Sequence, residues 1–143
     1  MTTGFQHLHS YFAYLVLLGI AISFIYALVG ALSGKSFGEK DRKMGLLGLI
    51  PTHIQLLVGL VLYFLSPVGF SNLGPGTMSD SMSRLYALEH PVINIIAVAL
   101  ITVGYSRAKK LTESKNQFRS IYMFYGIAFI LILSRIPWVA WLN

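Results

Sequence analysis

The chain contains no cysteine and little negative charge. Five of its 143 residues are Asp or Glu, against eleven Lys and Arg, and the formal net charge is +6. Without cysteine there can be no disulfide, no cysteine-ligated iron–sulfur cluster and no c-type haem attached through a Cys-x-x-Cys-His motif. Acidic residues are almost absent from the apolar runs, and no nucleophile–base pair is visible. Hydrolase and transferase chemistry is therefore not expected.

What the chain has instead is apolar sequence arranged in four blocks. Hydrophobic residues make up 55% of it and charged residues 11%, a balance far from that of a soluble domain. Each block is about long enough to cross roughly 30 Å of hydrocarbon as a helix, and none shows the strict alternation of a barrel strand. The blocks cover residues 11–32, 45–65, 85–105 and 121–142.

These blocks predict the fold class. Backbone polar groups in lipid must find their partners within the segment, so non-alternating spans of this length are helices. The sequence therefore predicts an all-α integral membrane protein, a four-helix up-and-down bundle that forms a single transmembrane domain over residues 1–143. The expected helices cover approximately residues 5–33, 44–66, 84–107 and 118–141.

Several residues in these helices have expected local roles. Pro51 should kink the second helix, because proline removes one backbone hydrogen bond. Pro91 is expected in the first turns of the third helix, where proline costs little, and Glu89 beside it should favour the positive end of the helix dipole. Trp138 and Trp141 are expected to be an interfacial anchor at the end of the fourth helix.

The basic residues predict the orientation in the membrane. Four lie in residues 34–44 and five in residues 106–119, so these two connections hold nine of the eleven Lys and Arg. By the positive-inside rule both connections are cytoplasmic, and both termini lie on the outer (periplasmic) side of a bacterial inner membrane. The expected partner of this multi-pass protein is the lipid bilayer, and no nucleic acid is expected.

The four histidines, His7, His9, His53 and His90, fall in or beside the predicted spans. Ionisable residues inside a membrane are functional candidates, and imidazole is a common axial ligand of haem. At about 1.5 Å per residue, His90 and His9 lie roughly 9 and 8 Å below the outer face, and His53 lies roughly 20 Å below it. His9 and His90 would be on diagonal helices that run the same way, so they could sandwich one iron. A shift of one or two turns would instead bring in His53.

Neighbours of this pair are further candidates. His7 and His9 differ by about 200° around a helix, so only one can point inward, and His9 is nearer the span. If the stretch is extended, the two could clamp a metal ion. Asn94 lies one turn below His90 and could bond its second ring nitrogen. Arg135 either pairs with haem propionates or extends to the interface.

The second helix carries a stripe of small and polar residues that share one face. The simpler interpretation is a helix-packing surface, since small residues let membrane helices approach closely. The functional interpretation is that glycine leaves room for a flat macrocycle. His53 flanks the stripe as a second ligand, a quinone-contacting group or a buried donor. The stripe consists of Gly45, Gly48, Thr52, Gln55 and Gly59.

Several stretches along nearly the whole chain resemble a family of short four-helix bacterial membrane proteins labelled cytochrome b-like. The layout is also similar to one four-helix half of haem A synthase, where histidines on two alternate helices bind a b-type haem. The resemblance implies haem b as cofactor and concerns His9, His53 and His90, without saying which two are axial. The stretches are FQHLHSYFAYLVL, THIQLLVGLVLYF, ALEHPVINIIAVALITVG and SRIPW.

The leading functional hypothesis is a b-type haem-binding membrane protein in electron transfer, as a small subunit of a larger complex. Its partners would be other membrane subunits and a quinone or a periplasmic electron carrier. One alternative is a haem-free accessory or scaffold subunit with hydrogen-bonded histidines. Another is a haem- or metal-handling assembly factor that uses His7 and His9. A transporter is not expected, because the chain is short and shows no inverted repeat.

Overall fold

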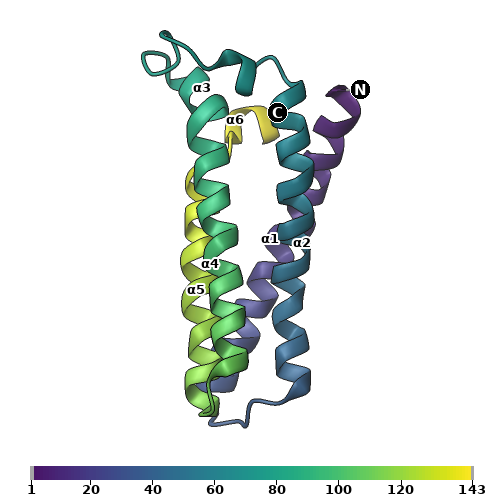
Figure 1. The fold of residues 1–143 in the computed structure, drawn as a ribbon. Coiled ribbons are helices and arrows are strands. Elements are labelled where there is room, and N and C mark those ends of the chain that lie inside the picture. Colours follow the sequence, from purple (N-terminus) through teal and green to yellow (C-terminus); the bar gives the residue numbers. More distant parts are fainter. Residues whose placement is uncertain (1, 143) are drawn as a thin grey trace.

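The structure is a computed structural model that describes residues 2–142, and it is all α-helical in its long elements. Four helical spans are long and apolar enough to cross a membrane. They are packed as an up-and-down bundle, which confirms the predicted architecture (Figure 1). The long helices are α1 (Thr2–Leu32), α2 (Glu39–Leu65), α4 (His90–Lys110) and α5 (Ser114–Ser134), and the short ones are η1 (Phe70–Asn72), α3 (Ser81–Arg84), η2 (Leu85–Glu89) and α6 (Trp138–Leu142).

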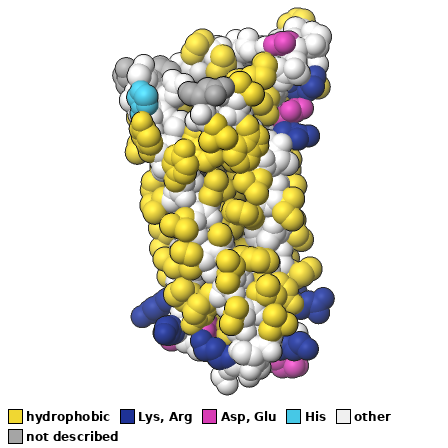
Figure 2. Space-filling model, turned by 180° about the vertical axis from the view of Figure 1, so that it is seen from behind, with side chains coloured by type: hydrophobic (Ala, Val, Ile, Leu, Met, Phe, Trp, Pro, Cys, Tyr) yellow, Lys and Arg dark blue, Asp and Glu magenta, His cyan; other side chains and the backbone are white. Residues whose placement is uncertain are grey.

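The order of the helices around the bundle brings α1 and α4 to opposite corners. Helix α1 packs against α2 and α5, and α4 packs against the same two neighbours. The start of α1, the long connection 66–80 and α6 lie together at one end, here called the histidine end (Figure 1). The connections 33–38 and 111–113 lie at the other, here called the basic end. Figure 2 shows Lys and Arg gathered there, below a wide belt of hydrophobic side chains.

The half of the bundle nearer the basic end holds the tightest core. Tyr125, Phe118 and Ile20 are among its largest fully buried side chains. The Tyr125 hydroxyl donates to the carbonyl of Gly45 at 2.8 Å, and Ser23 donates to the carbonyl of Met44 at 2.7 Å. Both bonds join α2 to another helix, so polar groups buried here are paired between helices.

Helix α2 begins at Glu39, five residues before its expected start. The Asp41 carboxylate accepts a hydrogen bond from the backbone N–H of Gly38 at 2.8 Å and so satisfies an orphan donor at the helix start. Asp41 also pairs with Lys35 at 2.6 Å. A buried carboxylate with two such partners lets the helix extend past the apolar block into the charged connection. Pro51 is contained within the continuous α2.

The third span begins at Ser81, where Asp80 accepts the backbone N–H of Ser83 at 3.0 Å as the N-cap. Pro91 lies in the first turn of α4, as expected, but α3 and η2 precede α4, so the proline is about ten residues inside the continuous span. Proline lacks the N–H that would bond the carbonyl four residues earlier, which belongs to Ala87. The span responds with a π-helical turn over Leu85–Glu89, the local widening that often occurs at functional sites.

The fourth span ends at Ser134, seven residues before its expected end. Arg135 leaves the helical conformation with ψ at 23°, and Pro137 follows two residues later, where it cannot continue a helix. The remaining turn is the separate helix α6, which folds back over the histidine end of the bundle (Figure 1). This break was not predicted, because the fourth apolar block of the sequence continues through it.

Candidate functional site

The half of the bundle nearer the histidine end encloses a cavity of about 530 Å³. All four spans and α6 contribute to its wall, which is mostly apolar. Its polar groups come from histidine, glutamine, asparagine, serine, threonine, tyrosine and tryptophan side chains, and no Lys, Arg, Asp or Glu is among the described residues that line it. The polar residues of the wall that matter below are His9, Gln55, Tyr63, His90, Asn94 and Trp141.

Two of the four histidines face each other in this cavity. The ring centroids of His9 on α1 and His90 on α4 are 6.0 Å apart, and their planes are nearly perpendicular, at 87°. The two helices are diagonal in the bundle, so the imidazoles meet across its interior and not along one helix surface. The depth matching of the sequence thus corresponds to a real juxtaposition.

The backbone of the chain fixes the state of the His90 ring. Its Nδ1 lies 2.8 Å from the carbonyl oxygen of Arg135, which can only accept a hydrogen bond. Nδ1 therefore carries the proton, and the lone pair of the neutral ring is on Nε2. Asn94, the partner expected for this ring, has its amide nitrogen 3.3 Å from Nδ1 and also donates to the His90 backbone carbonyl at 2.6 Å. Asn94 secures the helix turn, and the Arg135 carbonyl orients the ring.

The π turn positions His90, and a side chain of α2 stabilises the π turn. Because Pro91 has no N–H, the carbonyl of Ala87 lacks its usual helical donor. The hydroxyl of Tyr63 donates to that carbonyl at 2.7 Å. His90 closes the turn with its backbone N–H bonded to the carbonyl of Leu85. Tyr63 thereby compensates the proline and fixes the turn that precedes the histidine.

His9 is held from α2 at a point of close approach. Gln55 donates its amide N–H to the backbone carbonyl of His9 at 2.7 Å. A Cβ on Gly59 would lie 3.1 Å from Cε1 and 3.5 Å from Nδ1 of the His9 ring, so the absence of a side chain there makes room for the imidazole. Two glycines of the stripe on α2 thus have different roles. Gly48 lets α2 pack closely against Tyr125, and Gly59 makes room for the His9 ring.

The other two histidines lie outside the cavity wall. His53 is exposed on the bundle surface, with Nδ1 at 2.8 Å from the Leu49 carbonyl and Nε2 at 3.2 Å from the Thr102 hydroxyl. His7 is exposed, and its ring stacks on Tyr11 at 6.0 Å. Because the stretch is helical from Thr2, His7 and His9 point in different directions and do not form a clamp.

Arg135 and Glu89 belong to an ion-pair cluster beside the cavity. Arg84 donates from Nε to the Glu89 carboxylate at 2.9 Å, and Arg135 Nε lies 3.6 Å from its other oxygen. Neither arginine is among the residues that line the cavity. Glu89, expected near the positive end of the helix dipole, links the third span to the end of α5, and Asp80 provides the side-chain cap where the span begins.

Three residues that shape the site were not predicted as part of it: Gln55, Tyr63 and Trp141. The indole N–H of Trp141 donates to the Ser10 carbonyl at 3.0 Å and its ring packs on Tyr14, so α6 is fastened to α1 and closes one side of the cavity. Trp141 is therefore part of the cavity wall. Gln55 was detectable, because it shares the polar stripe of α2, whereas nothing in the sequence singles out Tyr63.

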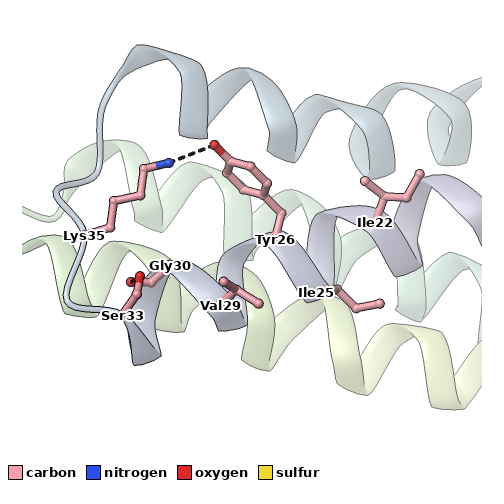
Figure 3. A pocket seen from close by; sticks show the side chains of 7 residues that line it. All are labelled: Ile22, Ile25, Tyr26, Val29, Gly30, Ser33 and Lys35. Atoms are coloured by element: carbon pink, nitrogen blue, oxygen red, sulfur yellow. Dashed lines mark hydrogen bonds between the residues drawn. The ribbon is translucent and has the colours of Figure 1, made fainter.

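A second, shallow groove lies on the outer surface of α1 near the basic end (Figure 3). Ile22, Ile25 and Val29 form its apolar floor, and Lys35 lies at its end. The Lys35 ammonium already bonds Asp41 at 2.6 Å and the Tyr26 hydroxyl at 2.9 Å, and these bonds hold the pKa of Lys35 above its usual value. The polar side chains of this groove already have hydrogen-bond partners within the protein, so the groove offers no unpaired group to a ligand.

The cavity can therefore offer two imidazole nitrogens to one metal centre. Within residues 2–142, no three His, Asp or Glu side chains come together as a metal-binding group. Two ligands on opposite sides suit a metal whose other positions are already filled by a planar ligand. A bare ion that requires three or four protein ligands would be held poorly here.

Comparison with known proteins yields one distant similarity. No family model matches the chain, and no solved structure matches it. In an alignment 136 residues long that covers 85% of this chain, it is 27% identical to a protein of Bacillus subtilis (strain 168) named as the uncharacterized amino acid permease YvbW. The chain spans 30% of the length of that protein. The four spans agree with a multi-pass membrane protein, and the similarity is too low to assign a family.

Proposed function

We propose that this chain is a cytochrome b-like membrane protein that holds one b-type haem between His9 and His90 and takes part in electron transfer. The observation that carries the proposal is the facing pair of imidazoles in one cavity. With metal–imidazole bonds of about 2 Å on each side and the ring radii added, one metal separates two centroids by roughly 6 Å. The centroids of His9 and His90 are 6.0 Å apart.

The surroundings of the pair support the same group. A volume of about 530 Å³ is within the usual range of cofactor and ligand sites, and a mostly apolar wall suits a flat macrocycle. His90 has its Nδ1 bonded to the protein, so its Nε2 is available as a ligand. Gly59, with no side chain, keeps the ring of His9 free of contact with a Cβ on α2.

In this proposal the protein supplies two nitrogen ligands, fixed ring orientations and a pocket that excludes water, which together tune the reduction potential. The haem would supply one-electron chemistry. Arg135 is the candidate cation for the propionates, since its guanidinium is half exposed and its contact with Glu89 is long, at 3.6 Å. Asn94 supports the His90 turn, and His53 takes no part in ligation.

We also propose where this happens in the cell. The basic end holds the connections rich in Lys and Arg, so by the positive-inside rule it faces the cytoplasm of a bacterium and the histidine end faces the periplasm. Electrons would then be exchanged near the periplasmic face. The wide apolar surface suits other subunits of a membrane complex, and a membrane quinone or a periplasmic carrier is the proposed redox partner.

The absorption spectrum of the purified protein, as isolated and reduced, tests the proposal. We expect a low-spin b-type spectrum that His90→Ala abolishes and His9→Ala weakens or abolishes, because each change removes one axial ligand. His53→Ala, the matched control on α2, should retain it. A colourless protein from haem-replete cells would contradict the proposal and favour a haem-free accessory subunit. A spectrum lost in His53→Ala and kept in His9→Ala would move the ligand to α2.

A second candidate function is a permease-like transport module, favoured by the 27% identity to the Bacillus subtilis protein. In that case the cavity would bind a small zwitterionic solute. A zwitterion buried away from water needs charged partners or helix ends, and no Lys, Arg, Asp or Glu is among the described residues that line the cavity. Stabilisation of the colourless protein by free amino acids, lost in His90→Ala, would favour this alternative.

A further inference from the structure

One pair of atoms in the cavity is left without partners. Among residues 2–142, two buried side-chain polar atoms have no hydrogen bond, and they are Nδ1 of His9 and Oε1 of Gln55. Both residues line the cavity. Buried polar atoms are nearly always paired, because an unpaired one costs free energy. Two such atoms on facing residues of one cavity therefore call for a common explanation.

The two atoms are chemically complementary in one tautomer. An amide oxygen can only accept a hydrogen bond, and Nδ1 of a neutral imidazole donates when it carries the proton. The Gln55 amide is already anchored, since its nitrogen donates to the His9 backbone carbonyl at 2.7 Å. Its oxygen belongs to the same amide group and is consequently held near His9.

We propose that Gln55 is the positioning residue of His9: its amide holds the backbone of His9 through the nitrogen and the Nδ1–H of the ring through the oxygen. The proton is then on Nδ1, and the Nε2 lone pair is free to bind a metal. His90 has the same state by another route, because its Nδ1 donates to the Arg135 carbonyl at 2.8 Å. This inference rests on the proposed function, and it identifies Gln55 as the residue that sets how strongly His9 binds a metal at the same site.

The role of Gln55 predicts effects on a bound haem. Removing a partner that orients a metal-binding histidine typically weakens metal affinity about 10- to 100-fold. Gln55→Leu should therefore weaken haem retention by about that factor and raise the reduction potential, since His9 becomes a weaker donor. Gln55→Glu retains an acceptor and makes it anionic, so the haem should stay bound and the potential should fall.

Gln117→Leu is the matched control. The Gln117 amide N–H also donates to a backbone carbonyl of a neighbouring helix, that of Ala108 at 2.9 Å, but at the basic end. A purely structural role for Gln55 would give Gln117→Leu and Gln55→Leu similar losses of thermal stability and unchanged potentials. Opposite shifts of the potential in Gln55→Leu and Gln55→Glu support the positioning role. An unchanged potential in both, with the low-spin haem still bound, overturns it.

The tautomer of His9 tests the inference without haem. In the haem-free protein labelled with ¹⁵N-histidine, NMR should show the His9 proton on Nδ1 in the wild type and a loss of this preference in Gln55→Leu. A His9 proton on Nε2 in the wild type overturns the inference. Because this readout needs no haem, failure of the proposed function appears as a colourless protein, and failure of the positioning role appears as the wrong tautomer.

Discussion

The same four helices serve different purposes in the two halves of the bundle. Near the basic end, Tyr125 and Phe118 fill the interior, and the Tyr125 hydroxyl ties α5 to α2. Near the histidine end, the same four spans diverge around a cavity of about 530 Å³ with an imidazole on each of two opposite sides. A half that is well packed can hold the fold together while the other half remains open for a ligand.

The halves also treat their polar groups differently. Near the basic end, buried hydroxyls such as Ser120, which donates to the Gly104 carbonyl at 2.8 Å, close hydrogen bonds between helices. Near the histidine end, Nδ1 of His9 and Oε1 of Gln55, the two atoms that we propose to pair with each other, have no other hydrogen-bond partner. Unpaired polar atoms are tolerated where a site is built for function and are rare where packing alone matters.

The largest expected loss of stability is at Tyr125. Tyr125→Ala should lower the free energy of unfolding by about 3 to 5 kcal/mol, because it empties the centre of the packed half and removes a buried hydrogen bond. Tyr11→Ala is the control near the other end, since Tyr11 is 70% exposed and should change stability by about 0.5 kcal/mol or less. Reversible unfolding in detergent measures both. Similar losses for the two variants would remove the distinction between the halves.

The two glycines of α2 should separate stability from binding. A Cβ at Gly48 would lie 2.8 Å from Tyr125 and 3.4 Å from the backbone of Ile20, so Gly48→Leu should cost about 1 to 3 kcal/mol. At Gly59 the neighbour is the His9 ring, which borders the cavity and can move, so Gly59→Leu should cost less stability.

Gly59→Leu should nevertheless remove the low-spin haem signal, because it displaces His9. Gly4→Leu is the control, since nothing lies within 4 Å of a Cβ there. Thermal stability and the absorption spectrum, measured on the same samples, distinguish the effects. If Gly59→Leu keeps both the low-spin haem signal and the thermal stability, Gly59 is not needed to make room for His9.

Two tyrosines that each donate one hydrogen bond between helices allow a matched comparison with smaller expected effects. Tyr63 donates to the Ala87 carbonyl at 2.7 Å and Tyr125 to the Gly45 carbonyl at 2.8 Å, each from one helix to another. Removing either hydroxyl with Phe should cost about 0.6 to 1.7 kcal/mol, as for other hydrogen bonds between membrane helices. Tyr63→Phe should in addition shift the haem spectrum, because it loosens the turn before His90. A spectral shift in Tyr125→Phe alone would contradict this placement.

The orientation of the two ends can be tested with almost no effect on the fold. The chain has no cysteine, so Lys40→Cys at the basic end and Ser79→Cys at the histidine end each provide a single thiol. A membrane-impermeant reagent added to intact cells should label position 79 and not position 40. Labelling of position 40 alone would reverse the proposed orientation.

The site was predictable in outline and not in its contacts. Depth along the helices pointed to His9 and His90, and the structure brings these two rings together. The partners of the rings were less accessible, because the Arg135 carbonyl that bonds His90 is a backbone atom with no sequence signature. Pro91 lies at the start of α4 as expected, but the helical turns that precede α4 and begin at the Asp80 cap were not predicted.

By itself, the sequence determined the membrane class, the four spans and the gathering of positive charge in two connections, because hydrophobic length and charge are local properties of the chain. Only the tertiary structure decided which side chains meet. The bond from Tyr63 that holds the π turn before His90, the fastening of α6 to α1 by Trp141 and the close approach at Gly59 are contacts between distant segments. Such contacts set the rotation and tilt of each helix, and these rotations decide which histidines face the cavity.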